Sequence, residues 1–276
     1  QLRGRDRRRR RAVLKIFRDY DQAGLDRQYE QRSFAPNADE IIRRYGAASD
    51  AARARFGEPE TLAYGASEVE ALDVYGEGRD RVVAFAHGGA WARMGRRPSA
   101  FAAGTFLDAG ATYAALGFGL LPSITLPVMV AQVCRALEFL RKKFRPKRFV
   151  LVGHSSGAHL SACALTRLPF IDAALLVSGV YDLEPVRLSS RNTYVRIDER
   201  LEHEYSPIRH VDRIVCPLTV ACGEKEGPEF FRQSKELAEK LSTPLLVGNG
   251  LNHFEMVETL ADPGSALARA ALGMLA

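Results

Sequence analysis

The chain has 276 residues, of which 46% are hydrophobic and 26% are charged. These values are typical of an ordinary soluble globular protein and exclude a low-complexity or fibrous chain. No run of eighteen apolar residues occurs, so the sequence predicts no membrane-spanning helix and no membrane partner.

The net charge of +6 is concentrated at the start of the chain. Residues 1–11 hold seven arginines and one aspartate, which account for the whole excess. This segment lacks the apolar core of a signal peptide, and we interpret it as a disordered basic tail. A nucleic-acid contact is the alternative interpretation. Because no aromatic residue is interleaved to stack on bases, we expect no nucleic-acid partner.

The cysteine pattern bears on the cellular compartment and on metals. The four cysteines are Cys134, Cys163, Cys216 and Cys222. They form no C-x-x-C pair and no Cys/His cluster with zinc spacing, and each lies in an apolar segment. We expect buried free thiols in a reducing compartment, which predicts a cytoplasmic protein without a metal site.

Residues 12–60 are polar and predominantly helical in pattern. Pro36-Asn37 marks the start of a helix, and Ile41, Tyr45 and Phe56 follow at roughly helical spacing. We expect this part of the chain to form a layer that covers one side of the core.

From residue 68 onward, strand and helix patterns alternate. Residues 69–75 alternate apolar and polar side chains, as an exposed antiparallel strand does. Continuous apolar runs predict buried strands at 82–86, 111–118, 149–152, 173–177, 218–221 and 245–247. Helical patterns occupy 99–108, 123–144, 228–241, 254–260 and 265–275. This order predicts one α/β domain over residues 12–276, with a mostly parallel sheet, helices on both faces and antiparallel N-terminal edge strands.

Residues 181–212 interrupt the alternation. They are polar, broken by Pro185 and Pro207, and too long for a plain connection. We interpret them as an irregular small lid beside the functional site.

The strand at 149–152 ends in the sequence Gly153-His154-Ser155-Ser156-Gly157 and is followed by an apolar, helix-compatible segment. G-x-S-x-G between a strand and a helix is the nucleophile-elbow pattern. The two glycines remove the Cβ atoms that would collide across so tight a turn. Ser155 is therefore the predicted nucleophile.

A serine hydroxyl needs a base, and the base needs an acid to orient it. Of six histidines, only His253 follows the last predicted strand, where this topology requires the base. The penultimate strand runs into Glu224-Lys225-Glu226, which supplies two candidates for the acid. The reasoning from position leaves the choice between Glu224 and Glu226 open.

Donors for a developing oxyanion are predicted in two places. One is the backbone N–H of Ser156, directly after the nucleophile. The other is the loop after the strand at 82–86, where Gly88 and Gly89 allow the backbone to turn its N–H groups toward Ser155.

These motifs resemble the α/β-hydrolase superfamily, in particular the esterase/arylformamidase (kynurenine formamidase-like) serine hydrolases. The resemblance covers about residues 20 to 275. It rests on Leu25 to Tyr29, His87 to Trp91, Gly153 to Leu160, Ser178 to Pro185, Gly223 to Phe230 and Asn252 to Phe254.

The resemblance implies the α/β-hydrolase fold and a Ser155–His253 pair. The family acid is usually an aspartate at the position of Glu226, so the glutamate here is a departure, and Glu224 stays a second choice. Members act on aryl formamides, notably N-formylkynurenine, and on small esters, with no cofactor. A small-molecule ester or amide is therefore the expected partner.

For the substrate pocket we expect Trp91, His154, Tyr181 and Phe118. Phe118 lies in an apolar run where the family often has polar residues, which weakens the prediction of formylkynurenine itself. Acyl transfer by the same triad, or a binding protein on this fold, are the alternatives to hydrolysis. Assembly into a homo-oligomer is left open.

Overall fold

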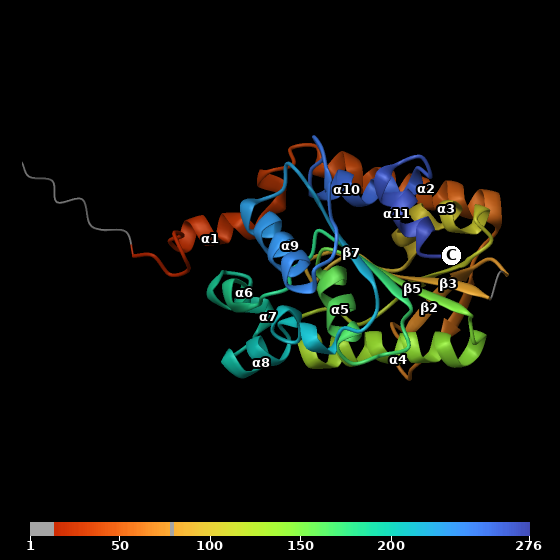
Figure 1. The fold of residues 1–276 in the computed structure, drawn as a ribbon, viewed down its shortest axis with the longest axis horizontal. Helices are drawn as coiled ribbons and strands as arrows, with labels where there is room; N and C mark the ends of the chain where they lie inside the picture. The colour runs from red at the N-terminus through yellow and green to blue at the C-terminus, as the bar shows by residue number, and fades with distance from the viewer. Residues whose placement is uncertain (1–13, 78–79) are drawn as a thin grey trace, which may run out of the picture.

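An eight-stranded sheet runs through the described residues, 14–77 and 80–276, of this computed structural model (Figure 1). The predicted basic tail at 1–11 lies outside the described residues. The strands are β1 Glu60–Ala63, β2 Ala71–Tyr75, β3 Arg81–Ala86, β4 Thr112–Leu116, β5 Arg148–His154, β6 Ala173–Val177, β7 Leu218–Gly223 and β8 Leu245–Gly248. Their order in space is β1-β2-β4-β3-β5-β6-β7-β8. Strands β3 to β8 are parallel, whereas β1 and β2 pair antiparallel at one edge.

Helices cover both faces of this sheet. They are α1 Gln22–Tyr29, α2 Ala38–Phe56, α3 Ala103–Asp108, α4 Leu126–Phe144, α5 Ser156–Leu165, α6 Glu184–Leu188, α7 Asn192–Val195, α8 Glu199–Glu204, α9 Pro228–Leu241, α10 His253–Glu258 and α11 Ala266–Gly273. Figure 1 shows α4 and α5 on one face and α2, α3, α10 and α11 on the other. The predicted parallel sheet with helices on both faces is therefore confirmed.

The central strands are buried on both faces, which explains their continuous apolar sequences. One core cluster joins the sheet to α4, α5 and α9, with Met129, Leu137 and Leu237 fully buried. The second joins the opposite face to α2, α3 and α10. The carboxyl ends of β3, β5, β6, β7 and β8 consequently meet at one edge of a rigid, well-packed sheet.

In the N-terminal half, one prediction is confirmed and one is wrong. Helix α2 starts after Asn37 as expected and is capped by Gly57 (φ +89°), before β1 begins at Glu60. Strand β2 is antiparallel but not exposed, since all five of its residues are buried. Its polar member Asp73 is paired there, because Oδ1 accepts from Nε of Arg96 at 3.0 Å and from Oγ1 of Thr61 at 3.0 Å.

The segment 181–212 is helical rather than irregular. It forms α6, α7 and α8 and continues into short 3₁₀ turns at Pro207–Arg209 and Val211–Arg213. Helices α7 and α8 both contact α6, and α1 packs against α6 as well (Figure 1). The role of this segment as a lid stays a prediction.

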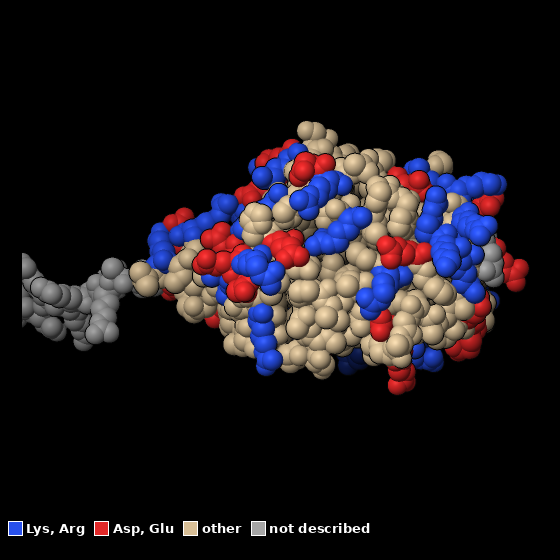
Figure 2. All heavy atoms as spheres, turned by 90° about the horizontal axis from the view of Figure 1, so that it is seen from below, with Lys and Arg blue, Asp and Glu red and all other residues tan. Residues whose placement is uncertain are grey.

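The charged side chains are spread over the visible surface and do not form one patch of a single sign (Figure 2). On the face in Figure 2, acidic and basic side chains are interspersed with wide uncharged areas. Within residues 14–77 and 80–276, no helix has the length and apolar character needed to cross a bilayer. All four cysteines are free thiols, and burial raises the pKa of Cys163 to about 12.

Candidate active site

Ser155 lies at the apex of the turn between β5 and α5. Its backbone has φ +56° and ψ −123°, a conformation that a non-glycine residue adopts only under strain. A Cβ at Gly153 would overlap Oγ of Ser161, and one at Gly157 would overlap the carbonyl oxygen of Ala86. The two glycines are therefore sterically required, as the elbow pattern predicts.

Three side chains from distant parts of the chain meet at this apex. Nε2 of His253 lies 3.0 Å from Oγ of Ser155, and Nδ1 of His253 lies 2.9 Å from Oε2 of Glu226. His253 is the first residue of α10, which Asn252 caps through its side chain. All three side chains are buried. The arrangement allows Nδ1–H to donate to the carboxylate while Nε2 accepts from the serine hydroxyl.

The two glutamates of the β7 loop lie in different environments. Oε1 of Glu226 accepts from the N–H of Gly223 at 2.6 Å and from Oγ of Ser178 at 2.5 Å. Glu224 is exposed, and its Oε2 accepts from the N–H of Gly250 at 2.6 Å. Of these two glutamates, only Glu226 contacts His253.

The loop after β3 faces the serine. Within the described part of the chain, the N–H groups of Gly88, Gly89 and Ser156 have no hydrogen-bond acceptor, and all three residues line the cavity at Ser155. Gly89 has φ +113°, and a Cβ there would overlap the carbonyl oxygen of Arg93. These free donors can bind a negatively charged oxygen.

Three further histidines around the apex are held neutral. Burial lowers the pKa of His87 and of His159 to about 4, and it lowers the pKa of His154 well below its usual value. His154 Nε2–H donates to the carbonyl oxygen of His253 at 3.1 Å. A charged ring at His154 would oppose protonation of the neighbouring His253, because like charges repel. A neutral His154 avoids this.

His159 joins three elements. Its Nδ1 accepts from the indole N–H of Trp91 at 3.1 Å, and its Nε2–H donates to the carbonyl oxygen of Tyr205 at 2.8 Å. The β3 loop, helix α5 and the segment after α8 are thus tied together at one buried ring.

A cavity of about 300 Å³ opens onto Ser155. Trp91 and His154 line it, and their contact with substrate stays a prediction. Its aromatic lining consists of Tyr29, Tyr45, Phe85, Trp91, Phe101, Phe230 and Phe254. The cavity therefore suits an aromatic or aliphatic group.

The other two pocket predictions are wrong. Tyr181 does not line the cavity, and its side chain is fully buried. Phe118 lies outside the lining because its ring stacks on that of His87, with centroids 4.4 Å apart.

Known proteins resemble this chain over nearly its whole length. It is 32% identical over 280 residues to kynurenine formamidase of Danio rerio, covering 91% of this chain and 95% of that protein. It is 30% identical over 289 residues to kynurenine formamidase of Salmo salar, covering 94% and 98%. The chain belongs to the kynurenine formamidase family.

Membership of the kynurenine formamidase family makes this chain a hydrolase. Residues 72–168 also match the BD-FAE family. A crystal structure of a candidate thioesterase from Silicibacter superposes with a TM-score of 0.82 at 25% identity, covering 90% of this chain and 98% of that one. An esterase of the bacterial hormone-sensitive lipase family superposes with a TM-score of 0.66 at 19% identity, covering 87% and 97%. The α/β-hydrolase fold is thereby confirmed.

Reasoning from the sequence missed the N-terminal contribution to this kynurenine formamidase-family site. Oε1 of Gln31 accepts from the N–H of Gly227 at 3.1 Å, and Oε1 of Gln28 accepts from the N–H of Glu229 at 3.3 Å. Gln31 also lines the cavity. Two glutamines near Tyr29 give only a weak indication of this role in the sequence. Their neighbours in the chain do not reveal that they contact the loop at Gly227 and Glu229, about 200 residues later.

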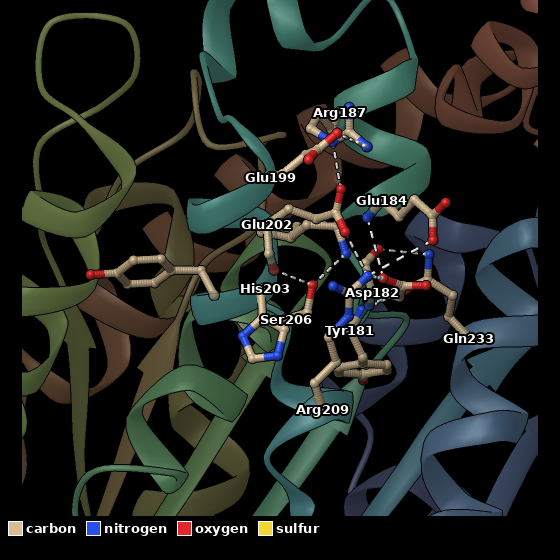
Figure 3. A network of polar contacts seen from close by, with 12 residues as sticks. Tyr181, Asp182, Glu184, Arg187, Glu199, Glu202, His203, Ser206, Arg209 and Gln233 are labelled. Carbon is tan, nitrogen blue, oxygen red and sulfur yellow. Dashed lines mark hydrogen bonds and ion pairs between the residues drawn. The ribbon is translucent and has the colours of Figure 1, made fainter. Parts of the chain in front are cut away.

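A charge network centred on the buried Glu202 was also missed. Figure 3 shows Arg187 and Arg209 on either side of Glu202, with Asp182 close to Arg209. Nε of Arg187 lies 2.5 Å from Glu202, and Nη2 of Arg209 lies 2.6 Å from Glu202 and 3.2 Å from Asp182. This network joins α6 to α8. It therefore stabilises the arrangement of the helices within the segment 181–212.

Proposed function

We propose that this chain hydrolyses a carboxylic ester or an aryl formamide through an acyl-enzyme formed on Ser155. The observation that carries the proposal is the pair of contacts at His253, 3.0 Å to Oγ of Ser155 and 2.9 Å to Oε2 of Glu226. A nucleophile, a base and an orienting acid in this geometry support acyl transfer.

In the first half-reaction, Nε2 of His253 takes the hydroxyl proton while Oγ of Ser155 attacks the substrate carbonyl carbon. The N–H groups of Gly88, Gly89 and Ser156 stabilise the tetrahedral oxyanion. When the intermediate collapses, the bond to the leaving alcohol or amine breaks, and His253 donates its proton to that group.

In the second half-reaction, His253 takes a proton from water, which attacks the acyl carbon. Collapse of this second intermediate releases the acid and returns the proton to Oγ of Ser155. Throughout, Glu226 holds the imidazole in the tautomer with Nδ1–H and stabilises its cationic form.

The proposed substrate class rests on the relatives and on the cavity. The two fish relatives are named kynurenine formamidases, and the aromatic lining of the cavity suits an aryl group. Aryl formamides and small aryl esters are thus the proposed substrates. A panel of both, ranked by kcat/KM, tests which is preferred.

The mechanism is tested by Ser155→Ala. Activity toward p-nitrophenyl acetate should fall by about 10⁴-fold or more. A fluorophosphonate should label the wild type and fail to label the variant. Hydrolysis by Ser155→Ala at the wild-type rate would show that the proposed mechanism is wrong.

A further inference from the structure

Ser178 is a buried serine in an unusual conformation next to the proposed triad. It directly follows β6, the strand beside the one that carries Ser155, and its side chain is fully buried. Its N–H donates to the carbonyl oxygen of Ala221 at 2.7 Å, which extends the pairing of β6 with β7. Its φ of +54° nearly equals the +56° of Ser155. Two neighbouring strands are thus each followed directly by a serine with positive φ.

The hydroxyl of Ser178 is directed at the triad acid. It donates to Oε1 of Glu226 at 2.5 Å, and the N–H of Gly223 donates to the same oxygen at 2.6 Å. Both donors occupy Oε1, so Oε2 is the oxygen that faces Nδ1 of His253 at 2.9 Å. The division of contacts fixes the rotation of the carboxylate.

A glutamate needs such an anchor more than an aspartate does. Its side chain has one additional rotatable bond, so a carboxylate held by a single donor can turn away from the imidazole. The backbone N–H of Gly223 alone defines one point of attachment. The hydroxyl of Ser178 adds a second, from a different strand.

We propose that Ser178 is a positioning residue that holds the carboxylate of Glu226 against Nδ1 of His253. This inference rests on the proposed function, because it concerns the same triad. The strained backbone supports it: glycine would adopt φ +54° more easily but would remove the hydroxyl that meets Glu226.

Two variants separate the hydroxyl from the backbone strain. Ser178→Ala removes the hydroxyl and keeps the strain, whereas Ser178→Gly removes both. In each, kcat toward p-nitrophenyl acetate should fall roughly 10- to 100-fold, as expected for a lost hydrogen bond to a charged group. KM should stay within about twofold of the wild type, because Ser178 does not line the cavity. Ser178→Gly should unfold at the same temperature as Ser178→Ala or a higher one.

Ser234→Ala is the matched control. Ser234 is a fully buried serine on α9, outside the triad and the β3 loop. This variant should keep the wild-type kcat. If Ser178→Ala and Ser178→Gly fold and also keep the wild-type kcat, the inference is overturned.

A double-mutant cycle with Glu226→Gln tests whether Ser178 acts through Glu226. In the Glu226→Gln background, Ser178→Ala should lower kcat by less than about twofold, since the group that it positions is already lost. Equal losses in both backgrounds would overturn the inference while leaving the triad intact. A wild-type kcat in Glu226→Gln would instead overturn the proposed acid together with this inference.

Discussion

Glu226 contacts His253 through a single oxygen, Oε2, 2.9 Å from Nδ1, whereas Glu224 lies at the surface and binds the N–H of Gly250. Two glutamates separated by one residue therefore face different groups, the imidazole of His253 for Glu226 and the turn at Gly250 for Glu224. Glu226→Gln should lower kcat by about 10³- to 10⁴-fold, because an amide favours the wrong imidazole tautomer. Glu224→Gln should change kcat less than about threefold.

These two variants are controls for each other, since both replace a carboxylate by an amide in the same loop. Steady-state kinetics with p-nitrophenyl acetate, measured side by side, decides the assignment. A larger loss in Glu224→Gln would contradict it.

The β3 loop offers a second matched pair. Gly89→Ala should lower kcat by about 10²-fold or more, because φ +113° and the overlap with the carbonyl oxygen of Arg93 would displace the proposed oxyanion donors. Gly95→Ala should leave kcat unchanged, because a Cβ at Gly95 meets nothing within 4 Å. Comparable kcat losses in the two variants would mean that Gly89 has no special role.

Acid should destabilise the fold through its buried neutral histidines. The pKa of His87 and of His159 is about 4 in the folded chain, against 6.5 in the unfolded chain. As pH falls below 6.5, only the unfolded chain gains these protons, so stability decreases until about pH 4. Each histidine contributes a loss of about 1.4 kcal/mol per pH unit in this window.

Urea unfolding at pH 7.5 and at pH 5.0 measures this loss. The free energy of unfolding should be about 4 kcal/mol smaller at pH 5.0 from these two histidines together. His159→Gln should reduce the difference by about half of that amount, because one titrating group is gone. An unchanged free energy between the two pH values would refute the prediction.

The strands and the order of the site residues could be read from the sequence for a physical reason. Ser155 follows the buried strand β5 and His253 follows the half-buried strand β8, and the carboxyl ends of parallel strands converge at one edge. The approximate meeting place of the nucleophile and base follows from that rule. The choice between Glu226 and Glu224 does not, because a loop decides which side chain turns inward.

The sequence-based predictions that were wrong or missing depend on where side chains point and on contacts between residues far apart in the chain. Phe118 leaves the end of β4 but turns onto His87 instead of toward the cavity. Asp73 appeared to mark an exposed strand because its partner Arg96 is 23 residues away and not recognisable in advance. Ser178 belongs to a motif that the sequence singled out, yet its contact with Glu226 depends on the packing of two strands.

The contacts of the N-terminal layer link the two ends of the chain. Gln31 binds Gly227 in the loop of Glu226, and Asn37 binds Asn252 and Glu255 around His253. During synthesis, the first of these residues emerge from the ribosome long before their partners exist. The loop of Glu226 and the start of α10 are therefore both held by residues that are made early in synthesis. The proposed site can form only after β8 and α10 have docked onto this N-terminal layer.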